Sequence, residues 1–432
     1  MPTPIICVAD PLRHFAEAFR GCFTKRQWKY FVTVLLALVQ CEARHTLTAL
    51  LRTVGEPVSL SGLSRFLSRA SWSPEAVAAL GLTRFRHQMA PAVAVEHQRQ
   101  RAQRPHRPGR PTATQVTGYL IVDDSVHEKP KGNAMAGLGR HFSPTDHRIV
   151  TGHVLVTGLY RLLGRRCPLP VSLYRQEAVC RREGVPFASK VDLALALIEQ
   201  FEPVPDTHTH LLIDSWYHNR KLSRAARQRG WDVSGGVKGN RMLRQVDGEG
   251  NRTWVRLAAY AAQLPPEQFE EARWPGADGG RRVYVHAVRT RVKGLGARQV
   301  LITLPERNAP LSQARYFAST RCEASIEELL QVLSYRWAVE VLFEDYKDLL
   351  GSDQYQVTSA AALVRYWTLI ACLASFLDEQ RAQQEEASGI PITWGEVRRD
   401  LQRQHCRNLL TWLEHQFRTG ATVEALYERL AA

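Results

Sequence analysis

The sequence is poor in the features that mark secreted, zinc-dependent or membrane-spanning proteins. Its eight cysteines are scattered and none forms a C-x-x-C pair, so neither a zinc framework nor a disulfide ladder is indicated. We interpret them as buried apolar side chains in a reducing cytoplasm. Residues 1–4 do not open a signal peptide. The apolar run at residues 30–41 is too short for a bilayer, so we expect a core helix and no membrane partner.

Acidic residues are also scarce beside basic ones. The chain has 57 Lys and Arg against 42 Asp and Glu, a net charge of +15. A polyanion is the natural partner of such a chain, and nucleic acid is the commonest polyanion, although a basic protein without that function is the alternative. Residues 1–112 hold 16 basic and 6 acidic residues, or ten of the fifteen net charges. This asymmetry predicts an N-terminal DNA-binding region.

The first part of the chain has the periodicity of helices. Apolar residues recur at helical spacing, and we expect residues 1–97 to form a helical DNA-binding region. Ser59 is placed to cap a short helix with a leucine face, from which Arg65 and Arg69 project towards DNA or towards solvent. Residues 98–113 combine arginines with three prolines and a glycine, which predicts a basic linker.

Strands alternate with helices from residue 114 onward, which predicts an α/β domain. Apolar runs at 119–122 and 210–213 are typical of buried strands. The stretch at 240–310 is β-rich and contains two strand-like runs that flank Gly-Leu-Gly, a hairpin signature. Ser325 is placed to begin the helical remainder of the chain.

Acidic residues stand where an α/β sheet would build a site. Asp124 and Asp214 end the two apolar strands, and Glu340 lies on a predicted helix among apolar neighbours. Each alone is typical of a turn, a cap or an ion pair. Together they can converge on hard cations such as Mg²⁺, the arrangement that phosphodiester chemistry needs. Asp123 competes with Asp124, because adjacent strand residues point to opposite faces.

A longer pattern surrounds the glutamate. The segment Y-R-W-A-V-E-V-L-F-E-D-Y-K, which ends at Lys347, resembles the signature of bacterial insertion-sequence DDE transposases. That signature is Y-x-x-R, three residues, E, six residues, and K. Arg336, Glu340 and Lys347 match its spacing, whereas the tyrosine position falls on Leu333 and Tyr335 adjoins the arginine instead.

Two further motifs carry the same resemblance. The run L-L-I-D-S-W-Y around Asp214 is similar to the family's second-Asp motif, and V-D-D-S, followed by E-K-P, is similar to the first. The family places its catalytic Asp directly before Ser or Thr, which favours Asp124 over Asp123. The resemblance extends over about residues 59–375 and implies an RNase H-like core with a β-rich insertion.

The resemblance implies the domain organisation and the site. We expect core segments at 114–239 and 311–384, the insertion at 240–310, and C-terminal helices at 385–432. The implied metal ligands and catalytic residues are Asp124 (or Asp123), Asp214 and Glu340, with Mg²⁺ as cofactor and Mn²⁺ as its substitute.

Several side chains near these acids are candidates for DNA contact. Arg336 and Lys347 share a helix face with Glu340 and can clamp phosphates, or form ion pairs within the helix. Trp216 and Trp337 can stack on an unpaired base, although we expect both in the core. A zinc site built from His208, His210 and Asp214 is disfavoured, because the expected cation prefers oxygen ligands.

The resemblance implies a transposase that cuts and joins DNA. Its partners would be double-stranded DNA, as terminal inverted repeats and target, and a second copy of the chain, since two ends must meet. We expect it in the cytoplasm at the nucleoid. The alternatives are a catalytically silent DNA-binding relative and a nuclease of the same fold.

Overall fold

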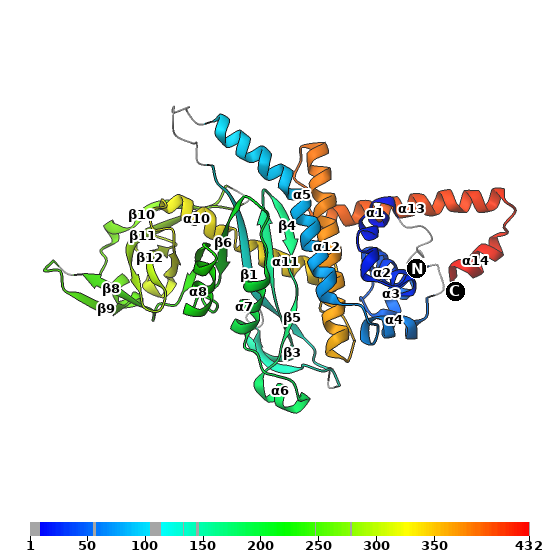
Figure 1. The fold of residues 1–432 in the computed structure, drawn as a ribbon, viewed down its shortest axis with the longest axis horizontal. Helices are drawn as coiled ribbons and strands as arrows, with labels where there is room; N and C mark the ends of the chain where they lie inside the picture. Colours follow the sequence, from blue (N-terminus) through cyan, green and yellow to red (C-terminus); the bar gives the residue numbers. More distant parts are fainter. Residues whose placement is uncertain are drawn as a thin grey trace.

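A single mixed β-sheet runs from one end of an elongated molecule, at β8 and β9, to its middle, and helices form the other end (Figure 1). The computed structural model describes residues 9–54, 58–103, 114–132, 134–143, 147–246, 248–276 and 279–431. Most of the predicted basic linker, residues 104–113, lies outside these ranges. Helix α5 continues to Ala102, so the first residues of that predicted linker are helical.

The helices are α1 (Asp10–Glu17), α2 (Lys25–Gln40), α3 (Leu47–Leu51), α4 (Leu60–Ser68), α5 (Pro74–Ala102), α6 (Glu177–Glu183), α7 (Lys190–Gln200), α8 (Arg220–Gln228), α9 (Leu257–Ala261), α10 (Ile326–Ser334), α11 (Trp337–Asp348), α12 (Ala360–Ser388), α13 (Trp394–Arg418) and α14 (Val423–Ala431). The strands are β1 (Val116–Glu128), β2 (Gly139–Ser143), β3 (Arg148–Leu162), β4 (Arg165–Pro168), β5 (Ser172–Tyr174), β6 (Thr207–Ile213), β7 (Asp232–Val237), β8 (Met242–Val246), β9 (Arg252–Arg256), β10 (Glu270–Trp274), β11 (Arg281–Val292), β12 (Gly296–Leu304) and β13 (Arg315–Ser319).

The core of the sheet has the strand order β2-β3-β1-β6-β7. The first three strands are antiparallel, whereas β6 and β7 run parallel to β1. This is the order and direction of strands in an RNase H-like core, and the predicted α/β class is confirmed. Strand β1 takes the central position because Leu120, Ile121 and Val122 are almost wholly buried and need cover on both faces.

The β-rich stretch extends this sheet and does not fold apart from it. Strand β13 pairs with β7, and the sheet continues through β12, β11, β8 and β9. The predicted hairpin is present, with Val292 paired to Gly296. Gly294 and Gly296 have φ values of 83° and 90°, a conformation that favours glycine. The predicted insertion is therefore continuous with the core through one hydrogen-bonded ladder.

The two faces of β1 bury different neighbours. Ile121 belongs to the hydrophobic cluster that contains Val339 and Leu342 of α11. Leu120 and Val122 belong to the cluster formed with α7 and α8. Because side chains alternate along a strand, this division determines which acidic residue beyond Val122 faces α11.

The N-terminal helices share their core with α12. The rings of Phe15 and Phe376 lie 5.2 Å apart, and Arg84 donates to Glu379 at 2.6 Å. Ser59 caps α4 by accepting the Gly62 N–H, as predicted. Among the described helices, α12 is long and apolar enough to cross a membrane, but most of its apolar window is buried in this core. The helical end is therefore packed as part of the body and not as a separate unit.

Candidate active site

Asp123 and Asp214 lie side by side where the parallel ladder between β1 and β6 ends, whereas β1 itself continues to Glu128, past the strand end predicted at Asp124. The ladder between β1 and β6 ends with Val122 paired to Ile213, so the next residues on the two strands are Asp123 and Asp214. By alternation from Ile121, the Asp123 side chain points to the α11 face of the sheet. Asp214 then begins a turn, where its carboxylate accepts the N–H groups of Trp216 and Tyr217 at 2.9 Å.

Glu340 of α11 is connected to Asp123 on this face of the sheet by Arg336. The Arg336 guanidinium donates to Asp123 at 3.3 Å and also to the Glu340 carboxylate one helical turn further on. The side chains of Asp123, Arg336 and Glu340 are 18%, 26% and 31% exposed, so the bridge is half-buried. The helical stretch expected from Ser325 is interrupted here, because α10 ends at Ser334 and α11 begins at Trp337.

Asp124 points to the opposite face and has its own partners. Its carboxylate accepts hydrogen bonds from Lys190 of α7 at 2.6 Å and from the Tyr217 hydroxyl at 2.7 Å. Tyr217 is fully buried, and burial together with the Asp124 charge raises the pKa of its hydroxyl. That hydroxyl therefore keeps its proton and donates to Asp124.

The acidic residues are crowded enough to perturb one another. Burial, followed by the charges of Asp214 and Asp124, raises the pKa of Asp123 to about 7. Burial also raises the pKa of Asp214, against the opposing effect of the Tyr217 and Trp216 N–H groups. Clustered, buried carboxylates with raised pKa values are typical of functional sites.

The predicted DNA-contact residues fall in two places. Lys347 lies on the Asp123 side of the sheet, since its charge lowers the pKa of buried His127 on β1. Trp216 and Trp337 are 60% and 57% exposed, so the expectation that they lie in the core was wrong. Each follows a site residue in the chain and has its ring in solvent, because the turn after Asp214 and the start of α11 both lie at the surface.

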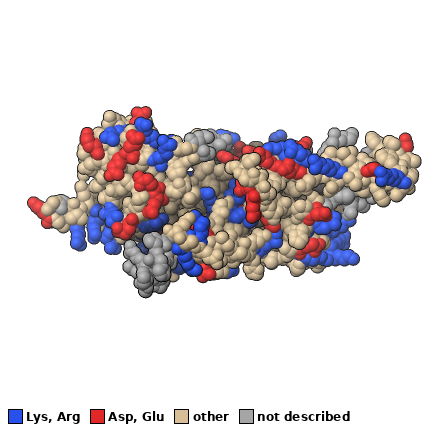
Figure 2. Space-filling view, turned by 90° about the horizontal axis from the view of Figure 1, so that it is seen from above, with Lys and Arg blue, Asp and Glu red and all other residues tan. Residues whose placement is uncertain are grey.

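Arg65 and Arg69 lie elsewhere, at the exposed surface of α4 and its C-terminal end in the helical part of the molecule (Figure 1). The structure does not bring them to the acidic residues. On the face shown in Figure 2, basic and acidic side chains alternate along the whole length of the molecule. The N-terminal excess of charge is thus not gathered into one patch on that face.

The remaining candidates have structural partners. Tyr335 packs on Tyr119 with ring centroids 4.6 Å apart, while Leu333 is buried. His208 pairs with Asp232 at 2.9 Å, and His210 bonds to Ser234 at 2.8 Å. These histidines are therefore committed away from Asp214, in keeping with the disfavoured zinc site.

Sequence reasoning missed three polar side chains that support the site. Lys190 and Tyr217 hold Asp124, and buried Lys129 donates to the backbone carbonyls of Asp353 and Tyr355 beyond α11. Tyr217 and Lys129 stand inside the recognised motifs, so their motif positions were a signal. Lys190 lies 66 residues from Asp124 and had no such signal.

The donor chemistry of the site suits a divalent cation, although its carboxylates do not close into a ligand cluster. Asp123, Asp214 and Glu340 offer only oxygen ligands, the type that Mg²⁺ prefers. Within the described ranges, no three His, Cys, Asp or Glu side chains are grouped closely enough to hold a metal. Arg336 instead provides the positive charge between Asp123 and Glu340.

Comparison with known proteins assigns the chain to a family. The model of the DDE superfamily endonucleases matches residues 18–252, more than half of the chain, and that of the transposase DDE domain matches residues 188–377. None of the curated proteins matches the chain. A cryo-EM structure of a piggyBac transposase synaptic complex with hairpin DNA aligns over 98% of this chain and 80% of its own, with 11% identity and a TM-score of 0.46. The chain therefore belongs to the DDE superfamily endonuclease family, and its core is that of a DDE transposase.

Proposed function

We propose that this protein cuts DNA at the ends of an insertion sequence and joins the cut strand to target DNA, with Asp123, Asp214 and Glu340 as its reactive acidic group. The observation that carries the proposal is the placement of Asp123 beside Asp214, on the face where Arg336 connects to Glu340. The sequence favoured Asp124, but that residue faces away and is neutralised by Lys190. We therefore assign Asp123 to the reactive group and Asp124 to the support of its strand.

A divalent metal bound to these carboxylates, Mg²⁺ or Mn²⁺, would activate the attacking water or 3′-hydroxyl and stabilise the leaving oxygen. The chain's own contribution is to collect the carboxylates and to hold the DNA strand beside them. Arg336 is half-buried between two carboxylates, so it orients Asp123 and Glu340. Lys347, two turns along α11 from Glu340, is free of such a bridge among the described residues and is placed to bind a phosphate.

The exposed indole of Trp216 gives the site a surface for a base. It directly follows the Asp214 turn, and the Lys238 ammonium lies 5.2 Å from its ring centroid. An exposed aromatic ring beside a cation suits an unpaired nucleotide, whose base stacks and whose phosphate is attracted. The expected partners are terminal inverted repeats, target DNA and a second copy of the chain, and the expected location is the cytoplasmic nucleoid.

The test is an Asp214→Asn variant of the full chain. Asn keeps the shape of the side chain but loses the charge, so metal-dependent cleavage of a duplex that carries the element's ends should fall to background while DNA binding persists. Asp206→Asn is the matched control, because Asp206 precedes the other end of β6 with a φ of 58°, which Asn tolerates. Normal cleavage by Asp214→Asn would refute the assignment.

Strand transfer separates the proposal from its two rivals. A nuclease of the same fold would cut the ends without joining them to a target plasmid. A silent DNA-binding relative would do neither. The joining of labelled ends to a plasmid, absent in Asp214→Asn, is the outcome that we expect.

A further inference from the structure

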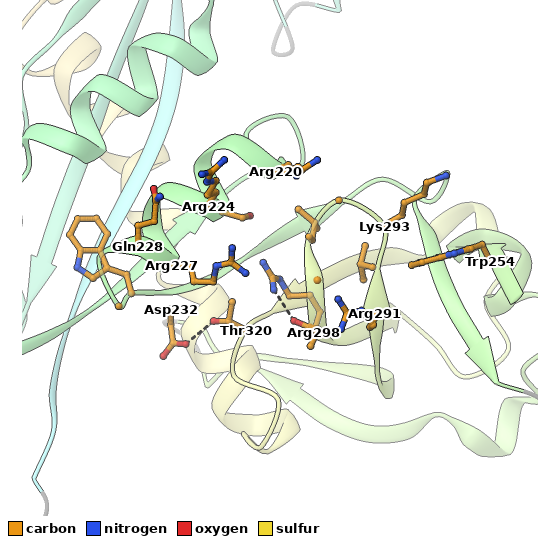
Figure 3. Close-up of a pocket in the computed structure, with 18 residues that line it drawn as sticks. Arg220, Arg224, Arg227, Gln228, Asp232, Trp254, Arg291, Lys293, Arg298 and Thr320 are labelled. Atoms are coloured by element: carbon orange, nitrogen blue, oxygen red, sulfur yellow. Dashed lines mark hydrogen bonds between the residues drawn. The ribbon is translucent and has the colours of Figure 1, made fainter. Parts of the chain in front are cut away.

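A basic groove lies between α8 and the β11–β12 hairpin, and none of Asp123, Asp214 and Glu340 lines it. It encloses about 1050 Å³ (Figure 3). One wall comes from α8 and the other from the hairpin, and Arg227 and Arg298 point towards each other across it. Six cationic side chains line it: Arg220, Arg224, Arg227, Arg291, Lys293 and Arg298.

The arginines of α8 form a row because of their spacing. Arg220, Arg224 and Arg227 are four and three residues apart and so share one helix face. The opposite face of α8 is apolar and packs against the core through Leu222 and Ala226. All three arginines are exposed, so the helix presents a cationic ridge to the groove.

This positive charge has no counter-charge within the described residues. None of the six cations forms an ion pair there, whereas many arginines elsewhere in the chain do. The single acidic residue in the lining, Asp232, already accepts from His208 and from the Thr320 hydroxyl. The groove is therefore an uncompensated cationic surface.

Arg298 differs from the exposed cations of the groove because its guanidinium is buried. It is only 6% exposed, and its Nε–H has no hydrogen-bond partner among the described residues. Its Nη1 group donates to the backbone oxygen of Ala297 at 2.7 Å. A buried guanidinium without a carboxylate is costly, and an anion in the groove would remove that cost.

The groove continues to the acidic cluster. A second hollow of about 860 Å³ shares Arg220 and Lys293 with the first and is also lined by Ser215 and Trp216, directly after Asp214. It adds Lys238, and also Lys221 and Arg241, which already bond to Asp192 and to the His218 carbonyl. The two hollows form one basic track from the Asp214 turn to Arg298.

We propose that this track binds the phosphate backbone of the DNA that leads into the acidic cluster, without reading its sequence. The inference rests on the proposed function and extends it by naming the surface that holds the DNA. Lysine and arginine contacts to phosphates position a duplex and carry no sequence information. They also release counterions, so each contact contributes to the salt dependence of binding.

The test is binding of the full chain to a fluorescein-labelled random-sequence 40-base-pair duplex, in EDTA, between 50 and 200 mM KCl. The variant Arg224→Ala/Arg227→Ala/Arg291→Ala removes three exposed track cations. Its log–log salt slope should be shallower by about 2.7, since each phosphate contact contributes about 0.9. Over this range, the wild type should lose about fortyfold more affinity than the variant loses.

The control removes equal charge from exposed arginines that already have ion-pair partners: Arg181→Ala/Arg403→Ala/Arg418→Ala. It should keep the wild-type slope. If the variant keeps that slope too, the track does not bind DNA, whatever the cleavage activity. Wild-type protein that binds through the track but never cleaves in Mg²⁺ would refute the proposed function and leave the track in place. If thermal melting shows that the triple variant is not folded, the double variant Arg224→Gln/Arg227→Gln takes its place. Its salt slope should be shallower than that of the wild type by about 2.

Discussion

The two faces of β1 treat adjacent carboxylates in opposite ways. Asp124 receives a lysine and a tyrosine hydroxyl, which neutralise it and satisfy both of its oxygens. Asp123 shares one arginine with Glu340, and burial, followed by the charges of Asp214 and Asp124, raises its pKa to about 7. Two adjacent residues thus differ in their surroundings: Asp124 has a lysine of its own, whereas Asp123 shares its arginine with Glu340.

The largest effect should come from the substitution of one aspartate at a time. We expect Asp123→Asn to lower metal-dependent cleavage roughly 1000-fold, because it removes a ligand from the crowded face. Asp124→Asn should cost about tenfold or less, since Lys190 can still donate to the amide oxygen and the Tyr217 hydroxyl can turn to accept from the amide N–H. The measurement is the single-turnover cleavage rate at saturating Mg²⁺, with binding in EDTA as the control. The reverse order would return the first position to Asp124.

Glu340 offers a comparison along one helix. Glu340→Gln should reduce cleavage by a few hundredfold, whereas Glu344→Gln, one turn further on α11 and exposed, should leave it near the wild-type rate. Both changes keep the side-chain shape and remove one negative charge, but only Glu340 is bonded to Arg336. Normal cleavage by Glu340→Gln, with loss in Glu344→Gln, would mean that the motif alignment is shifted by a turn.

On the Asp124 face we expect a loss of stability before a loss of chemistry. Tyr217→Phe removes a buried hydrogen bond to a carboxylate, which should lower the free energy of unfolding by about 1.5–3 kcal/mol. Tyr427→Phe, at an exposed position of α14, is the matched control. Urea unfolding gives the comparison, and equal stabilities would show that the hydroxyl does not hold Asp124.

The smallest effect is a pH dependence from the Asp123 face. The folded pKa of Asp123 is raised from 3.8 to about 7, so its carboxyl is protonated below that pH and cannot bind a cation well. Cleavage should therefore rise about tenfold from pH 6 to pH 8, and the midpoint should move to lower pH as Mg²⁺ increases. Asp123 favours the fold at low pH and loses that contribution as the pH passes 7. A rate that is flat across this range would contradict the assignment of Asp123.

The sequence predicted the elements that carry the acidic residues but not the faces. Apolar runs and motif spacing located Asp124, Asp214 and Glu340 on their elements, and the hairpin is present, but β1 continues beyond the predicted end at Asp124 to Glu128. The choice between Asp123 and Asp124 depends on which helix covers each side of β1. The helix on the Ile121 side packs through residues more than 200 positions away, such as Val339 and Leu342, and periodicity does not carry that information.

Charge counts and residue types were weaker guides to surface properties. The count pointed to the first 112 residues, yet the cations of α8 and the hairpin are the ones that line a common groove. The two tryptophans looked like core residues by type, but the turn after Asp214 and the start of α11 expose them. Those outcomes follow from tertiary packing, which composition does not record. A fragment of the N-terminal helices is also a poor test of DNA binding, because α12 completes their core.

The pairing of Val237 with Tyr316 has an evolutionary consequence. The chain leaves the core after β7 and returns as β13, its immediate antiparallel neighbour, so residues 238–314 enter and leave at one point of the sheet. A short turn between β7 and β13 would close a simple hairpin and leave every acidic residue of the cluster in place. Residues 238–314 could thus be lengthened, exchanged or lost without moving the acidic cluster, and the hairpin wall of the basic groove would change with them.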